Sequence, residues 1–144
     1  MSGEPWPADS SLGRLAARLA LAPRFAGDLR DDESLACLYS GARLYVHPAL
    51  TEGFGLPPLE AMKCGTPVLC SSGGALPETV GDAAVLLPPA DPERWAAEIE
   101  ALLGDEARRA DLVRRGLARA ATFTWEKAAA RTLEVYEQAL RSGV

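Results

Sequence analysis

The chain has 144 residues, 48% of them hydrophobic and 24% charged, a balance typical of one globular domain with a sizeable core. Its net charge of −5 at pH 7 offers no basic surface for nucleic acid or for an anionic membrane, so we expect small-molecule or protein partners. No apolar run approaches the roughly 20 residues that span a bilayer, so no transmembrane segment is predicted.

The three cysteines are Cys37, Cys64 and Cys70, an odd set without a C-x-x-C pair. Each lies among apolar or small residues, which predicts buried free thiols rather than a disulfide framework or a metal site. Residues 1–11 are polar and interrupted by prolines, unlike a secretory leader. We therefore expect a cytoplasmic protein with an irregular leader at 1–11 and a single domain at 12–144.

Hydrophobic periodicity and capping residues predict a series of helices along the chain. Their expected ranges are about 12–19, 32–42, 57–63, 76–80, 92–104, 106–121 and 125–140. Ser10 or Ser11, Asp31 or Asp32, Asp91 and Thr124 are the predicted caps. In the second helix we expect one shared face formed by Leu35, Leu38, Tyr39 and Ala42. In the last helix we expect five inward positions: Trp125, Ala129, Leu133, Tyr136 and Leu140.

Short apolar runs predict strands between these helices, at about 24–27, 44–47, 67–70 and 83–87. The run at 44–47 does not alternate with polar residues, so we expect it to be covered on both faces. Strands that alternate with helices predict an α/β fold with a parallel, Rossmann-like sheet. Ligands of such sheets bind at the carboxyl ends of the strands, where Gly27-Asp28, Glu52 to Gly55 and Ser71 to Gly74 are expected to converge.

The most informative stretch is the loop from Glu52 to Glu60, where a strand is followed by Gly53, Gly55 and a helix that starts at the prolines. A glycine-containing turn before a helix N-terminus is a favourable place for an anion. Pro57 and Pro58 have no N–H group, so the amides of Gly55 and Leu56 are the expected phosphate donors.

The two carboxylates suit hydroxyl groups better than phosphate. Glu60, expected in the first helical turn, would be repelled by a diphosphate and could instead accept hydrogen bonds from a vicinal diol such as ribose. Glu52 could accept from the hydroxyls of a sugar. For each residue alone, a helix N-terminal charge (Glu60) or a solvated loop acid (Glu52) is the alternative. His47, just before the loop, is predicted to be a packed strand-end residue rather than an acid or base.

The motifs around this loop resemble the retaining glycosyltransferases of family 4, the group 1 glycosyl transferases with a GT-B fold. The matching segments are Tyr45-Val46-His47-Pro48, Glu52-Gly53-Phe54-Gly55-Leu56-Pro57, Leu59-Glu60-Ala61-Met62 and Gly65-Thr66-Pro67-Val68. Phe25-Ala26-Gly27, Leu38-Tyr39, Leu76-Pro77-Glu78, Gly81-Asp82-Ala83-Ala84 and Phe123-Thr124-Trp125-Glu126 are similar to further family motifs.

The resemblance implies the donor-binding, C-terminal part of an enzyme that transfers a hexosyl group, mannose or glucose, from a GDP- or UDP-linked sugar to a hydroxyl acceptor. It implies that Glu60 holds the ribose, that Glu52 contacts the donor sugar, and that Gly53, Phe54, Gly55 and Leu56 surround the sugar and its diphosphate. It places Gly27, Asp28 and Leu29 near the base. It also implies retention of configuration without a metal or other cofactor, with Glu52 as a positioning and charge-stabilising residue rather than a nucleophile.

Two parts of the family pattern have no counterpart in the sequence. These are the Arg and Lys that neutralise the diphosphate and the N-terminal acceptor domain. Removing the first strands of a doubly wound sheet would leave an unpaired apolar edge, so we expect an N-terminally truncated chain that continues a longer enzyme or pairs with another chain. Alone, it is expected to bind the donor weakly and to transfer nothing. The alternatives are a non-catalytic nucleotide-sugar-binding or subunit-interaction module, or an interaction protein that has lost its ligand.

Overall fold

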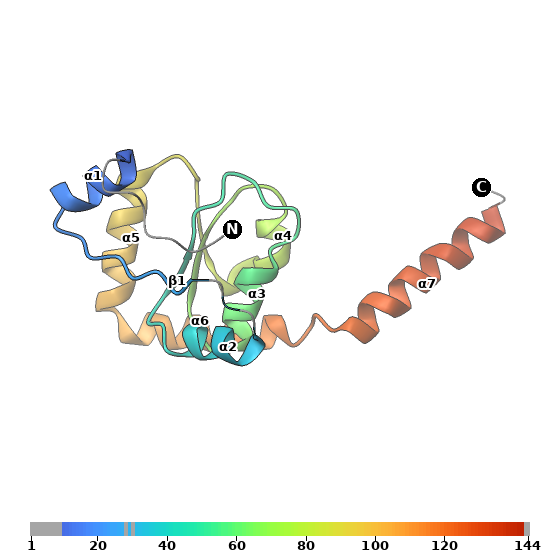
Figure 1. Cartoon of the computed structure of the whole chain (residues 1–144). Coiled ribbons are helices and arrows are strands. Elements are labelled where there is room, and N and C mark those ends of the chain that lie inside the picture. The colour runs from blue at the N-terminus through green and yellow to red at the C-terminus, as the bar shows by residue number, and fades with distance from the viewer. Residues whose placement is uncertain (1–9, 28, 30, 143–144) are drawn as a thin grey trace. The chain divides into compact units, whose positions relative to one another are not determined.

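The computed structural model describes residues 10–27, 29 and 31–142 (Figure 1). The chain divides into two compact units, Met1–Leu35 and Ala36–Val144, which are described one at a time. Of the predicted leader, residues 1–9 lie outside the described residues.

The first unit contains helix α1 (Ser11–Arg18), and Ser10 is its cap as predicted. The Ser10 hydroxyl accepts a hydrogen bond of 3.0 Å from the Gly13 amide, which satisfies one free N–H group of the first turn. The prediction of a strand at 24–27 is wrong, because these residues have no regular secondary structure. A strand needs a neighbour for its backbone groups, and the sheet of the described chain is built entirely from later residues.

Helices and strands then alternate along the chain. They are α2 (Asp32–Ser40), β1 (Tyr45–His47), α3 (Leu56–Lys63), β2 (Val68–Ser71), α4 (Leu76–Val80), the 3₁₀ turn η1 (Gly81–Ala83), β3 (Val85–Leu87), α5 (Pro92–Gly104), α6 (Glu106–Ala120) and α7 (Trp125–Ser142). The predicted caps are confirmed for Asp31, Asp91 and Thr124, whose side chains accept from the amides of Ser34, Arg94 and Lys127.

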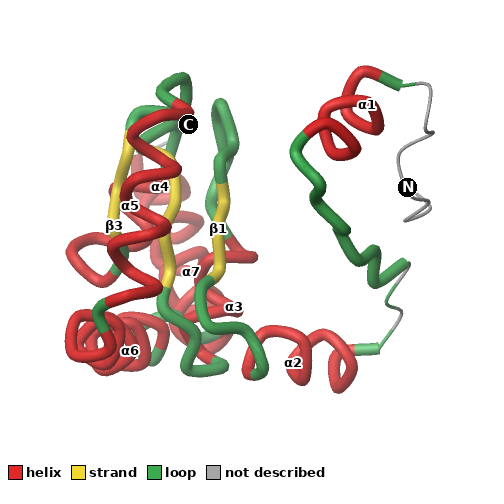
Figure 2. The backbone as a smooth tube through the Cα atoms, turned by 90° about the vertical axis from the view of Figure 1, so that its left-hand side faces the viewer, coloured by secondary structure: helices red, strands yellow, loops and turns green. Residues whose placement is uncertain are grey.

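The three strands form one parallel sheet in the order β1-β2-β3, which confirms the predicted α/β fold (Figure 2). Val46 pairs with Leu69, and Leu69 with Val85. Side chains alternate across a strand, so these three share one face of the sheet. They pack there with Trp95 and Leu102 of α5.

Tyr45, His47 and Cys70 lie in the other registers of the same strands and therefore face the opposite side. Helix α3 covers that side, in contact with β1 and β2, and α6 packs against α3. Strand β2 is buried throughout, whereas every residue of β1 is only half-buried. Leu44 and Val46 pack toward α5 on one face and α3 contacts β1 on the other, so the 44–47 run is covered on both faces as predicted, although only partly. Within the described chain β1 pairs with β2 alone and forms an edge of the sheet.

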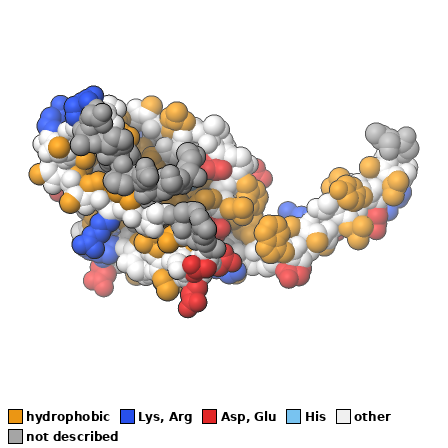
Figure 3. All heavy atoms as spheres, in the orientation of Figure 1, with side chains coloured by type: hydrophobic (Ala, Val, Ile, Leu, Met, Phe, Trp, Pro, Cys, Tyr) orange, Lys and Arg blue, Asp and Glu red, His pale blue; other side chains and the backbone are white. Residues whose placement is uncertain are grey.

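The predicted buried face of the last helix is also wrong. No residue of α7 is buried, and Trp125 and Leu140 are each 81% exposed. Hydrophobic side chains are visible along this helix in Figure 3. In α2, where Leu38 and Tyr39 were predicted to share one face, Tyr39 is buried but Leu38 is 52% exposed. Periodicity identified these apolar stripes correctly, but it carries no information on whether another segment covers them.

The cysteines are free, as predicted, although their burial differs from the prediction. Cys70 is buried in β2, Cys64 is half-buried, and Cys37 is exposed on α2. None of the helices in the described ranges is both long and apolar enough to cross a bilayer.

Candidate functional site

The loop between β1 and α3 turns at Gly55, which caps α3 with a left-handed backbone (φ +97°). A Cβ at this position would lie 2.9 Å from Leu76 Cδ2 in α4. Both the backbone conformation and the close packing therefore require glycine here. Gly53 differs, since a Cβ there would meet nothing within 4 Å.

The loop after β2 supports the loop after β1. The Ala75 amide donates to the Glu52 carbonyl at 2.9 Å, and Ser71 Oγ donates to the Ala49 carbonyl at 2.5 Å. Gly74 approaches so closely that a Cβ would collide with the Glu52 backbone. Two of the three loops predicted to converge at the carboxyl ends of the strands therefore do so.

Both the backbone and the side chain of Phe54 contact other segments of the chain. The Thr79 hydroxyl of α4 donates to the Phe54 carbonyl. The Phe54 ring makes an edge-to-face contact with Phe123, with centroids 5.9 Å apart. The Arg119 guanidinium lies over the Phe123 ring, with Arg119 Cζ 4.9 Å from the ring centroid. The loop conformation thus depends on α4 and on the end of α6.

Glu52 has protein partners on both carboxylate oxygens. His47 Nε2 lies 3.2 Å from Oε2, and the Gly53 amide donates to Oε1 at 3.2 Å. The Glu52 side chain remains 30% exposed, so a ligand can still reach it. His47 is indeed a partly buried strand-end residue, but it also contacts a predicted site residue, which the sequence alone did not indicate.

Glu60 belongs to the second turn of α3 rather than the first, because the helix begins at Leu56, one residue before the prolines. It is exposed, and the Tyr39 hydroxyl donates to its Oε2 at 3.3 Å. Tyr39 is a functional candidate that sequence reasoning missed. The sequence contains it within the Leu38-Tyr39 motif, but a contact between residues 21 positions apart has no local pattern.

The expected phosphate donors, Gly55 and Leu56, lie at the start of α3, which begins one residue earlier than predicted. Gly55 precedes α3, and Leu56 is the first residue of the helix. The first intrahelical hydrogen bond after the prolines is donated by the Leu59 amide to the Gly55 carbonyl, at 3.4 Å. Gly55 itself is buried, whereas Phe54 is 47% and Leu56 49% exposed, so solvent reaches the loop on either side of the glycine.

The third predicted group, Gly27 to Leu29, belongs to the first unit. Gly27 has a left-handed backbone (φ +73°), and both Gly27 and Leu29 are exposed. Asp28 lies outside the described residues. The role of these three residues near a base stays a prediction.

Within the described ranges, neither Glu52 nor Glu60 forms an ion pair with a Lys or Arg, and no cluster of His, Cys, Asp or Glu could hold a metal ion. The imidazole of His47 lies 3.2 Å from Glu52 Oε2 and carries charge only when it is protonated.

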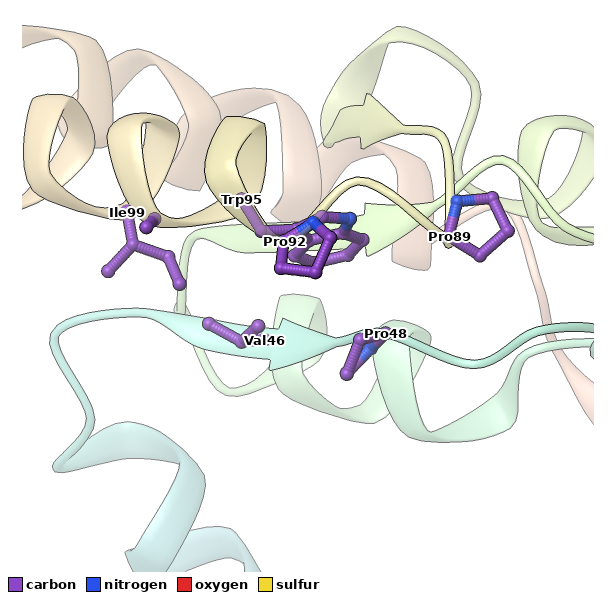
Figure 4. Close-up of a pocket in the computed structure, with 7 residues that line it drawn as sticks. Val46, Pro48, Pro89, Pro92, Trp95 and Ile99 are labelled. Atoms are coloured by element: carbon purple, nitrogen blue, oxygen red, sulfur yellow. The ribbon is translucent and has the colours of Figure 1, made fainter. Parts of the chain in front are cut away.

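A separate hollow of about 360 Å³ lies on the opposite face of the sheet, between β1 and α5 (Figure 4). Its lining is apolar and includes Val46, Pro48, Trp95 and Ile99. The indole N–H of Trp95 already donates to the Pro88 carbonyl at 2.8 Å. Because the lining offers almost no polar group, this hollow suits hydrophobic packing rather than a nucleotide or sugar.

A parallel sheet whose first strand is followed by a glycine turn and a helix N-terminus, with two solvent-accessible carboxylates on this loop and helix, is typical of a Rossmann-like ligand-binding domain. Residues 9–119 match the family described as "Glycosyl transferases group 1", and the chain belongs to this family. The predicted resemblance is thereby confirmed.

Individual relatives agree with this assignment. The chain is 46% identical over 106 residues to O-antigen chain mannosyltransferase B of Escherichia coli, covering 74% of this chain and 28% of that protein. It is similar to sucrose-phosphate synthase from Thermosynechococcus elongatus, with a TM-score of 0.79 and 34% identity over 97% of this chain and 37% of the other. Anabaena HepE, solved in complex with UDP, has a TM-score of 0.78 and 25% identity, covering 88% of this chain and 36% of that one. The chain thus spans less than two-fifths of the length of each relative.

Proposed function

We propose that this chain binds the nucleotide-diphosphate sugar of a retaining hexosyltransferase, with the Glu52-to-Glu60 stretch as the donor site. The observation that carries the proposal is the arrangement of this stretch: two solvent-accessible carboxylates, Glu52 and Glu60, lie on either side of the glycine turn that follows β1 and caps α3. Mannose and glucose, linked to GDP or UDP, are the proposed donor sugars. The named mannosyltransferase relative and the UDP complex of HepE support this choice.

Each group has a proposed role. The amides of Gly55 and Leu56 bind the diphosphate, since the N-terminus of α3 carries partial positive charge. Glu60 accepts from the ribose hydroxyls, and Glu52 contacts the hexose and stabilises the positive charge that develops on it during transfer. The proposal includes retention of configuration and no metal ion.

Binding by this chain alone should be weak. A diphosphate brings negative charge next to Glu52 and Glu60, and the chain's described residues place no Lys or Arg beside either one. Amide dipoles offset only part of this repulsion. We therefore expect a Kd of roughly 1 mM for the isolated chain, with no transfer, and propose that the remaining part of a longer enzyme or a partner chain supplies the cationic groups and the acceptor site.

The ligand is tested by calorimetric titration of the chain with GDP-mannose, UDP-glucose and the corresponding free hexoses. Saturable binding of at least one nucleotide sugar, with no binding of the free hexoses, is the expected result. If no nucleotide sugar binds at millimolar concentration, the proposed function is wrong.

The proposal that another part of the enzyme packs against this chain is tested separately. Among the described residues β1 pairs with β2 alone, and the apolar hollow beside Val46 lies next to its other edge. We propose that further strands and a helix from the rest of the enzyme pack there. A dye that fluoresces on exposed apolar surface should bind the folded chain strongly. A monomeric, cooperatively folding chain that binds no dye would refute this part of the proposal.

A further inference from the structure

We propose that His47, Tyr45 and Tyr39 are positioning residues that orient the two donor-binding carboxylates, His47 and Tyr45 acting on Glu52 and Tyr39 acting on Glu60. This inference rests on the proposed function for the roles of the carboxylates. It assigns new roles to three side chains on β1 and α2.

The first branch runs from Tyr45 through His47 to Glu52. The Tyr45 hydroxyl lies 3.1 Å from His47 Nδ1, and His47 Nε2 lies 3.2 Å from Glu52 Oε2. The rings of Tyr45 and His47 stack with centroids 5.9 Å apart and an interplanar angle of 24°. The imidazole is thus held both by ring stacking and by a hydrogen bond at each nitrogen.

These partners define one tautomer of the neutral ring. An ionised carboxylate only accepts hydrogen bonds, so His47 Nε2 carries the proton and donates it to Glu52. Nδ1 then accepts from the Tyr45 hydroxyl. The Gly53 amide fixes the other oxygen of Glu52. Each carboxylate oxygen has two acceptor positions, so both remain able to accept from a sugar hydroxyl in a fixed orientation.

The second branch runs from Tyr39 to Glu60. The Tyr39 hydroxyl donates to Glu60 Oε2 at 3.3 Å. Tyr39 is only 8% exposed, and its backbone carbonyl accepts from the buried hydroxyl of Thr66 at 2.6 Å. A rigid, buried donor therefore restrains an otherwise exposed carboxylate, and leaves most of its acceptor positions for a diol.

The two branches touch where Tyr39 and Tyr45 make an edge-to-face contact, with centroids 5.3 Å apart. Burial raises the pKa of both tyrosines, so the hydroxyls keep their protons and remain donors across the neutral range. A purely structural role would need the aromatic rings but neither hydroxyl. Replacing only the hydroxyl groups therefore separates positioning from packing.

The first test uses the fact that His47 is the single histidine of the chain. In ¹⁵N-histidine-labelled protein, at a pH where the spectrum shows a neutral ring, the proton should be on Nε2. In Tyr45→Phe the Nδ1 resonance should move, because that nitrogen loses its hydrogen-bond donor, while Glu52 keeps the proton on Nε2 and the chain stays folded by circular dichroism. A proton on Nδ1, or an Nδ1 resonance unchanged in Tyr45→Phe, would overturn the inference, and neither result requires a ligand.

The second test compares a nucleotide sugar with the same nucleoside diphosphate lacking the sugar. His47→Leu should weaken binding of the nucleotide sugar about three- to tenfold and leave the nucleoside diphosphate unchanged, since only Glu52 faces the hexose. His47→Gln, whose amide can donate near the Nε2 position, should recover most of the loss. Tyr39→Phe should weaken both ligands equally, because Glu60 faces the ribose.

Equal losses for both ligands in His47→Leu, or no loss in any of the variants, would contradict the positioning roles. If the wild-type chain binds neither ligand, the proposed function fails, whereas the tautomer measurement still decides whether His47 orients Glu52.

Discussion

Replacing Gly55 with alanine perturbs the site at the residue that defines its shape. Gly55 has φ +97°, and a Cβ there would lie 2.9 Å from Leu76 Cδ2 and 3.6 Å from Thr79 Cγ2. Leu76 is fully buried, so it cannot turn away into solvent. Thr79 supports the Phe54 carbonyl and is also restricted.

Two contributions set the expected loss in the free energy of unfolding of Gly55→Ala. A left-handed backbone costs an alanine about 1–2 kcal/mol relative to glycine. Forcing one extra carbon against a buried side chain typically costs about 1–3 kcal/mol. Together they predict that Gly55→Ala lowers the free energy of unfolding by about 2–5 kcal/mol. With a urea m value of about 2 kcal/mol/M, the midpoint should fall by about 1–2.5 M.

Urea unfolding followed by circular dichroism measures this change, and Gly53→Ala is the matched control. Gly53 lies two residues earlier in the same loop, but a Cβ there meets nothing within 4 Å. Its midpoint should change by less than about 0.5 M. Equal midpoints for the two variants would refute the argument that Gly55 is required by its conformation and by Leu76.

Three further predictions concern the surroundings of the loop. Phe123→Ala removes the ring that contacts both Phe54 and Arg119, so the free energy of unfolding should fall by about 1–2 kcal/mol, and an unchanged urea midpoint would show that this contact does not stabilise the loop. Burial raises the pKa of the Cys70 thiol to about 12, so a thiol reagent at pH 8 should modify the exposed Cys37 at once and Cys70 only on unfolding; rapid modification of Cys70 in the folded chain would contradict its burial. Burial also raises the pKa of Tyr45 above its ordinary value of 10.0. The stability that this shift contributes is complete below pH 10 and is lost as the pH rises through the pKa of Tyr45 in the folded chain. Urea midpoints between pH 9 and 11 should therefore fall less steeply in Tyr45→Phe than in the wild type, and parallel curves would argue against this.

Local patterns predicted much of the fold because local physics determines it. The caps Asp31, Asp91 and Thr124 depend on residues a few positions apart. The parallel sheet followed from strands that alternate with helices.

The errors concern contacts with distant segments. The run at 24–27 has the composition of a strand, yet pairing decides whether it forms one. The apolar stripe of α7 has helical spacing, but its Trp125 and Leu140 are exposed because no described segment packs over them. Periodicity describes a surface and does not identify what covers it.

In the candidate site, too, local patterns were predicted and contacts between distant segments were not. The sequence placed Glu52, Gly55 and Glu60 on one loop and helix start, because they are close along the chain. It did not show that Tyr39 reaches Glu60 or that His47 bonds to Glu52, since these contacts depend on how α2, β1 and α3 pack.

The central claim is that Glu60 binds the ribose of a nucleotide sugar, and calorimetry of Glu60→Gln tests it most directly. The matched control is Glu100→Gln, which removes the same charge from an exposed position on α5. The account predicts that wild type and Glu100→Gln bind the nucleotide sugar with the same affinity, and that Glu60→Gln binds at least tenfold more weakly. Equal affinity of Glu60→Gln and wild type would contradict it.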